Sequence, residues 1–231
     1  MHRLQLQPRH QKLSRRALLS GAATMICAAL APVSIAWNAQ SLQSSMQQRF
    51  GQPGLKRLQA WMQILQLQQG REIGQQLAAI NDFWNIHVLA GVDQQIWNEA
   101  DYWATPIESL GKGTGDCEDF VIGKYFSLIR LGVPAQQMRL IYVRARVGGI
   151  GSQRSVAHMV LGFYASPQVD PLVLDNLVGS IQVASQRTDL TPVFSFDAEA
   201  VYVGGARSAS SDRINRWKNL LVRMRQEGFD V

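Results

Sequence analysis

Apolar positions recur at helical spacing through the first half of the chain. Between Leu55 and Leu65 they fall three or four residues apart, and a second run with the same period extends from Ile73 to Val88. Gly70 interrupts the pattern, so the two runs predict a helical hairpin. Residues 38–52 are rich in Gln and Ser and show no clear period, which favours a flexible start.

Two further helices are expected before the middle of the chain. The first is short and covers 93–100, with Asp93 as its N-cap. A glycine-rich segment at 111–115 then predicts a tight loop. After it, apolar residues at helical spacing predict a helix over 116–131 that stops before Gly132.

The pattern changes to strands in the second half. Runs of apolar and β-branched residues predict strands near 140–143, 159–164, 172–174, 180–184, 192–196 and 200–203. A last amphipathic helix is expected over 211–227, capped by Ser210 or Ser211. Helices first and antiparallel strands later predict an α+β fold.

The first 36 residues have the features of an export signal. They contain five basic residues and no acidic one, and an apolar stretch over 17–36 closes with the small-x-small sequence Ser34-Ile35-Ala36. We therefore expect residues 1–36 to be cleaved, leaving a single domain over 37–231. Ser14–Leu19 resembles a twin-arginine signal, so the periplasm is the expected location. An uncleaved membrane anchor is the alternative, because 17–36 is just long enough to span a bilayer.

Removal of this segment changes the charge and the cysteine content. It carries five of the 23 basic residues and none of the 17 acidic ones, so the formal net charge falls from +6 to +1. A nearly neutral domain gives no reason to expect nucleic acid as a partner. Cys27 leaves with the signal, so Cys117 is the one cysteine of 37–231 and has no disulfide partner there.

Cys117 is a candidate nucleophile. It stands at the start of the helix predicted over 116–131, where unpaired backbone N–H groups and the positive end of the helix dipole favour a thiolate. A lone thiol in an exported protein calls for a chemical reason. The structural alternative is an inert buried cysteine, which is common among free thiols.

One histidine and one aspartate follow in the order that a thiol hydrolase needs. His158 lies in a strand predicted over 155–164 and could take the thiol proton; Asp175 follows another strand and could fix the imidazole tautomer. A core histidine and a turn aspartate are the alternatives, and both stay open. The backbone N–H of Cys117 is the first choice of oxyanion donor, with Trp103 or Asn98 as a second. The other histidine, His87, is expected on a helix face without a catalytic role.

Three carboxylates surround Cys117 in the sequence, at Asp116, Glu118 and Asp119. Acids are favourable at a helix N-terminus, yet they also raise the pKa of a neighbouring thiol. A bound Ca²⁺ would cancel that charge, and carboxylate oxygens suit it. The chain contains neither the spacing of a zinc site nor that of a phosphate-binding loop.

Four separated segments resemble the bacterial transglutaminase-like cysteine proteinases, in particular their LapG type. They are residues 101–106, 115–120, 158–161 and 171–176, and the resemblance spans 75–205. It implies a papain/transglutaminase-like core in which N-terminal helices pack with an antiparallel sheet. It also implies a calcium-dependent periplasmic endopeptidase, with Cys117 as nucleophile, His158 as base and Asp175 as orienting acid. Calcium ligands are implied at Asp116 and Glu118.

The resemblance extends to substrate and regulator. It implies cleavage of the N-terminal region of a large surface adhesin, which releases cells from biofilm. It also implies inhibition by an inner-membrane LapD-like receptor. Two other readings remain: an acyltransferase or transglutaminase that uses the same three residues, and a periplasmic interaction module without catalysis. No stable membrane insertion is expected after signal cleavage.

Overall fold

The computed structural model describes residues 39–149, 151–211 and 214–231. The expected export signal over 1–36 lies outside these residues. Within the part of the chain that is described, no helix is both long enough and apolar enough to cross a membrane.

The chain begins with two helices that pack against each other. α1 (Ala39–Gln68) contains a kink at Gly51, whose φ of 65° is left-handed, and α2 (Ile73–His87) follows as expected. The expectation of a flexible start over 38–52 is wrong. Its described part, 39–52, belongs to α1, because Leu42 and Met46, four residues apart, are buried on one face beneath a polar surface of Gln and Ser.

A stretch of short elements connects α2 to the centre of the fold. β1 (Leu89–Ala90) pairs in parallel with β2 (Thr114–Gly115), and between them lie α3 (Asp93–Ile96) and α4 (Pro106–Lys112). α3 is shorter than expected and its N-cap is Val92. The carboxylate of Asp93 instead accepts a hydrogen bond of 2.6 Å from the backbone N–H of Tyr102.

α4 was not expected from the apolar pattern, although its start carries a local signal. Thr105 accepts a hydrogen bond from the N–H of Glu108, and Glu108 accepts one from the N–H of Thr105. This reciprocal capping, with Pro106 at the first helical position, is readable in the sequence. The helix ends at Gly113, which has a left-handed φ of 70°.

α5 (Cys117–Arg130) is the central helix. Every residue from Asp119 to Ile129 is buried, and the helix contacts α2, α4, β3 and β4. Its first turn is closed by Asp116, which accepts hydrogen bonds from the N–H groups of Glu118 and Asp119. A helix buried all round is fixed in place by its neighbours, so the position of Cys117 is well defined.

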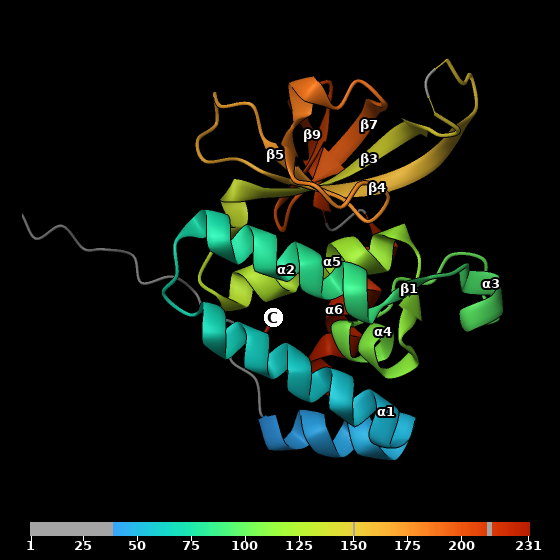
Figure 1. Ribbon diagram of the computed structural model, residues 1–231, viewed down its shortest axis with the longest axis vertical. Helices are drawn as coiled ribbons and strands as arrows, with labels where there is room; N and C mark the ends of the chain where they lie inside the picture. Colours follow the sequence, from blue (N-terminus) through green and yellow to red (C-terminus); the bar gives the residue numbers. More distant parts are fainter. Residues whose placement is uncertain (1–38, 150, 212–213) are drawn as a thin grey trace, which may run out of the picture. The chain divides into compact units, whose positions relative to one another are not determined.

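The second half forms a seven-stranded antiparallel sheet in the order β6-β5-β4-β3-β7-β8-β9. The strands are β3 (Met138–Arg146), β4 (Ser155–Phe163), β5 (Leu172–Leu174), β6 (Gln182–Val183), β7 (Leu190–Phe196), β8 (Ala200–Val203) and β9 (Ala206–Ser210). Figure 1 shows the helices gathered on one side of this sheet. Short 3-10 helices precede β3 (η1, Ala135–Gln137) and β7 (η2, Ala184–Gln186).

The last helix, α6 (Asn215–Gln226), completes the core. It begins later than the expected 211–227 and buries Trp217, Leu220 and Met224 as its apolar period predicts. Trp217 stacks on Phe126 of α5, so the C-terminal helix also supports the central one. The α+β prediction, with helices packed on an antiparallel sheet, is confirmed.

Ser127 of α5 forms hydrogen bonds with both α1 and α2. Its hydroxyl oxygen accepts hydrogen bonds from the indole N–H groups of Trp61 (2.8 Å) and Trp84 (2.9 Å), and its hydroxyl donates to the carbonyl of Gly123 (2.6 Å). Ser127 and both indoles are buried, where an unpaired polar group is costly.

Replacing Ser127 with Ala should leave two buried indole N–H groups without an acceptor. We expect a loss of about 2–4 kcal/mol in the free energy of unfolding, from about 1–3 kcal/mol for each unsatisfied group. Urea denaturation measures this. Ser44→Ala on the exposed face of α1 is the control and should change stability by under about 0.5 kcal/mol. Equal effects of the two substitutions would contradict the assignment.

Candidate active site

Cys117 is the first residue of α5, directly after the N-cap Asp116. Its side chain is partly buried against the main hydrophobic core. The thiol donates to Oε2 of Glu118 at 2.7 Å, and the hydroxyl of Tyr142 donates to Oε1 of the same carboxylate at 3.3 Å. Burial raises the pKa of the Cys117 thiol, and the charges of Glu118 and Asp116 raise this pKa further.

His158 and Asp175 form a buried pair. Nε2 of His158, on β4, lies 2.7 Å from Oδ1 of Asp175, the residue that follows β5. The two residues are 3% and 1% exposed. Because an ionised carboxylate can only accept, Nε2 must carry the proton and donate it to Asp175. Nδ1 is then the basic nitrogen of the neutral ring.

The Asp175 carboxylate remains ionised to low pH. Burial alone would raise its pKa, but hydrogen bonds and charge from His158 and Arg187 outweigh that effect and lower the pKa to about 2. Oδ1 also accepts from the N–H of Leu177 at 2.9 Å, while Oδ2 accepts from Nη2 of Arg187 at 2.7 Å. The imidazole and the carboxylate are therefore held together in one fixed, buried arrangement.

The thiol lies beside the strand that carries the imidazole. The backbone N–H of Met159, the residue after His158, partly offsets the rise in the pKa of Cys117. α5 packs on β4 over much of its length. Among the described residues no hydrogen bond joins Sγ to the ring, since the thiol donates to Glu118. The structure thus brings His158 and Asp175 into direct contact and places Cys117 next to that strand.

The two side chains considered as oxyanion donors lie in different surroundings. Trp103 is 3% exposed and stacks on Phe196 with ring centroids 5.7 Å apart, so its indole belongs to the core. Asn98 is exposed and accepts a hydrogen bond from Gln94. The oxyanion role of Trp103 stays a prediction.

Three aspartates converge next to Cys117. One carboxylate oxygen from each of Asp93, Asp116 and Asp119 lies within 4.8 Å of the others. Asp116 was expected here as a ligand. Asp119 was one of the three carboxylates considered for calcium but not one of the ligands that the resemblance implied, and Asp93 was not named as a ligand. Glu118 lies outside this cluster with its carboxylate on the thiol and on Tyr142, so its role as a ligand stays a prediction.

The aspartate cluster fits a hard cation. Oδ1 of Asp93 is buried without a hydrogen-bond partner among the described residues, and the Asp93 carboxylate lies close to that of Asp116. Burial and the neighbouring charges of Glu118, Asp119 and Asp93 raise the pKa of Asp116 to about 9, and the pKa of Asp119 is raised as well. A divalent cation held by the three carboxylates would neutralise the negative charge beside the thiol.

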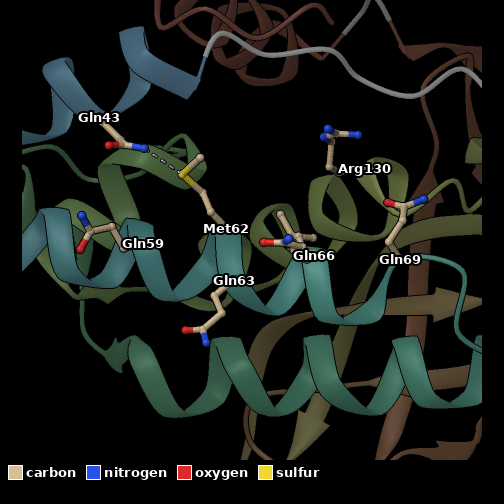
Figure 2. Close-up of a pocket in the computed structure, with 8 residues that line it drawn as sticks. Gln43, Gln59, Met62, Gln63, Gln66, Gln69 and Arg130 are labelled. Carbon is tan, nitrogen blue, oxygen red and sulfur yellow. Dashed lines mark hydrogen bonds between the residues drawn. The ribbon is translucent and has the colours of Figure 1, made fainter.

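The cavity in Figure 2 is separate from this chemistry. It has a volume of about 460 Å³ and is lined by glutamines of α1, by Met62 and by Arg130. Arg130 ends α5, whereas Cys117 begins it, and a helix of 14 residues is about 21 Å long. The cavity therefore lies at the opposite end of α5 from Cys117.

His87 has a structural environment on α2. Its Nδ1 lies 2.9 Å from the carbonyl oxygen of Phe83, and the rings of His87 and Phe83 stack with their centroids 4.2 Å apart.

A thiol at the start of a buried helix, packed against strands that carry a paired imidazole and carboxylate, is the arrangement of a transglutaminase-like cysteine proteinase. The model of the family described as bacterial transglutaminase-like cysteine proteinase matches residues 58–191, which include Cys117, His158 and Asp175. The chain therefore belongs to this family. A comparison with curated protein sequences gave no significant match.

Solved structures of LapG from Legionella pneumophila are similar to this chain. One is 34% identical and covers 83% of this chain and 99% of its own, with a TM-score of 0.70. A calcium-bound form is 36% identical, with coverages of 81% and 99% and a TM-score of 0.68. An EGTA-treated form is 35% identical, with coverages of 83% and 100% and a TM-score of 0.70.

Calcium loading should reverse a pH-dependent loss of stability. Asp116 has a higher pKa folded than unfolded, so in EGTA the free energy of unfolding should fall as pH rises from about 4 towards 9. Calcium at 100 times its Kd should add about 2.7 kcal/mol, or roughly 5–10 °C in Tm. Asp116→Asn can still cap α5 and should flatten the pH dependence and remove most of the calcium shift.

Differential scanning calorimetry across this pH range, with and without calcium, measures both effects. Asp230→Asn, at an exposed carboxylate, is the control and should behave as the wild type. An Asp116→Asn protein that retains the full calcium shift would show that the ion binds elsewhere.

The contact between Glu118 and the thiol should govern thiol reactivity in calcium-free protein. Glu118→Gln removes the negative charge beside Sγ, so the pKa of Cys117 should fall. We expect alkylation by iodoacetamide at pH 7.5 in EGTA to be about 10-fold faster, equivalent to one pKa unit. Glu72→Gln, at an exposed position, is the control and should alkylate at the wild-type rate.

Proposed function

We propose that this protein is a calcium-dependent cysteine endopeptidase with Cys117 as nucleophile, His158 as general base and acid, and Asp175 as the carboxylate that orients the imidazole. The observation that carries the proposal is the buried 2.7 Å contact between His158 Nε2 and Asp175 Oδ1, with Cys117 at the helix start beside the same strand. Membership of a cysteine proteinase family supports it.

The protons carried by these three residues determine the steps of the proposed reaction. Nδ1 of His158 takes the proton of Cys117, and the thiolate attacks the carbonyl carbon of a peptide bond. When the C–N bond breaks, the imidazolium gives its proton to the leaving amine. Water then attacks the thioester while His158 takes a proton from it, the C–S bond breaks, and the thiol is restored.

Two features of the helix start serve this reaction. Cys117 is the first residue of α5, so its backbone N–H has no acceptor within the helix and can donate to the tetrahedral oxyanion. Calcium would be held by Asp93, Asp116 and Asp119, with Glu118 as a further candidate ligand. The calcium-bound and EGTA-treated LapG structures support calcium as the ion.

The proposal includes a substrate, a location and a regulator. We propose that the protein acts in the periplasm after removal of residues 1–36, exported by the twin-arginine route. Its substrate would be the N-terminal region of a large surface adhesin, whose cleavage releases cells from biofilm. An inner-membrane LapD-like receptor would hold the enzyme inactive. Similarity to LapG at 34–36% identity supports this part.

Cleavage of adhesin N-terminal fragments by residues 37–231 in calcium tests the reaction. Cys117→Ala should abolish it, and His158→Ala should lower kcat by about 10²–10⁴-fold, the usual contribution of general acid–base catalysis. Asp175→Asn should also lower kcat strongly, because an amide can stabilise the wrong tautomer. Mass spectrometry identifies the products.

Two control variants keep the comparison specific. Ser155→Ala, at an exposed position of β4, and His87→Gln, at the structural histidine, should cleave within about twofold of wild type. Products that carry a new isopeptide or amide bond would favour acyl transfer over hydrolysis. A Cys117→Ala protein that cleaves the fragments at the wild-type rate would contradict the proposal.

A further inference from the structure

Arg187 is a buried guanidinium on the far side of the catalytic carboxylate. It directly follows η2 and is 4% exposed. Nη2 donates to Oδ2 of Asp175 at 2.7 Å and to Oδ2 of Asp189 at 2.8 Å, and Nε donates to Oδ1 of Asp189 at 2.9 Å. One planar group therefore bridges two carboxylates.

This bridge fixes the orientation of Asp175. A guanidinium has its donors in a rigid plane, and Asp189 binds two of its nitrogens in a forked contact that sets the direction of the third interaction. Oδ2 of Asp175 is held by Nη2, so Oδ1 is left facing Nε2 of His158. The carboxylate cannot turn about its terminal bond without breaking a charge-assisted hydrogen bond at each oxygen.

We propose that Arg187 and Asp189 are positioning residues of the endopeptidase: Asp189 holds the Arg187 guanidinium, and the guanidinium holds Asp175 so that His158 keeps its proton on Nε2. This inference rests on the proposed function. It extends the site by a chain of four residues, joined by three ion pairs, that runs from His158 on β4 to the partly exposed carboxylate of Asp189.

Other charged groups near Asp175 act without a hydrogen bond to it. Lys124 of α5 is completely buried, its Nζ has no hydrogen-bond partner among the described residues, and burial lowers its pKa to about 7. It interacts with Asp175 and with Asp82 of α2 through their charges. Asn85 of α2 is neutral and donates to the backbone carbonyl of Asp175. Arg187 and His158 are therefore the side chains that bind the carboxylate itself.

Variants of Arg187 and Lys124 can distinguish an effect of the orientation of the Asp175 carboxylate from an effect of positive charge near it. Lys124→Met removes a buried amine, which is positively charged below its pKa of about 7, and leaves every hydrogen bond of Asp175 in place. Arg187→Lys keeps the charge, but a single ammonium cannot reproduce the planar contacts to both carboxylates. If orientation is the role, Arg187→Lys should disturb His158 and Lys124→Met should not.

The test measures the tautomer of His158 by ¹⁵N NMR and, separately, kcat and KM for cleavage, all on purified calcium-loaded protein. The NMR samples carry Cys117→Ala to prevent turnover. Arg187→Lys and Asp189→Asn should lower the fraction of the Nε2–H tautomer and reduce kcat about 5–50-fold, with KM within twofold, because substrate contacts are unchanged. Asp189 is partly exposed, so we expect Asp189→Asn to fold as the wild type does.

Asp170→Asn is the matched control. Its carboxylate accepts from the N–H of Ser185 in η2 without contacting the guanidinium, so tautomer and kcat should match wild type. An unchanged tautomer and kcat in Arg187→Lys and Asp189→Asn, or an equal tautomer change in Lys124→Met, would overturn the inference. If wild type cleaves nothing, the proposed function fails, and the tautomer still decides the role of Arg187.

Discussion

Asp119 links three parts of the molecule through one buried carboxylate. Oδ2 accepts from the N–H of Asp116 and so closes the first turn of α5, while Oδ1 accepts from the N–H of Ala104 in the segment before α4. The same carboxylate belongs to the aspartate cluster. Gly115 allows the Asp119 carboxylate to lie against the backbone of residue 115, because a Cβ atom there would be only 2.7 Å from Oδ2 of Asp119. The start of the central helix, the chain before α4 and the metal candidate site are therefore coupled.

This coupling explains why the helix start can carry both a nucleophile and an excess of negative charge. The cap needs carboxylates to satisfy the first N–H groups of α5, yet the same charges raise the pKa of the thiol. In the proposed reaction, His158 and Asp175 supply the base from the side of the sheet, outside the acidic cluster. A cation held by the aspartate cluster would relieve this conflict, and that is the chemical role we propose for calcium.

The helices and strands whose positions depend on local patterns of apolar residues could be predicted from the sequence. The helical period located α2, α5 and most of α6, and apolar runs located β3, β4 and β5, which placed Cys117, His158 and Asp175 on the correct elements. Asp93 was predicted to be a cap because it stands at the start of a predicted helix. Its actual neighbours, Asp116 and Asp119, are distant in sequence and are brought next to it by the fold. Arg187 was missed because no period connects a residue between two strands to a carboxylate twelve positions earlier. Such contacts are set by tertiary packing alone.

The burial of α5 on all sides limits how this protein can respond to a ligand. Its neighbours on every face leave no room for the helix to slide or tilt, because close-packed interiors resist small displacements. Ion loading at its tip is therefore expected to reorient side chains of one turn and to leave the scaffold unchanged.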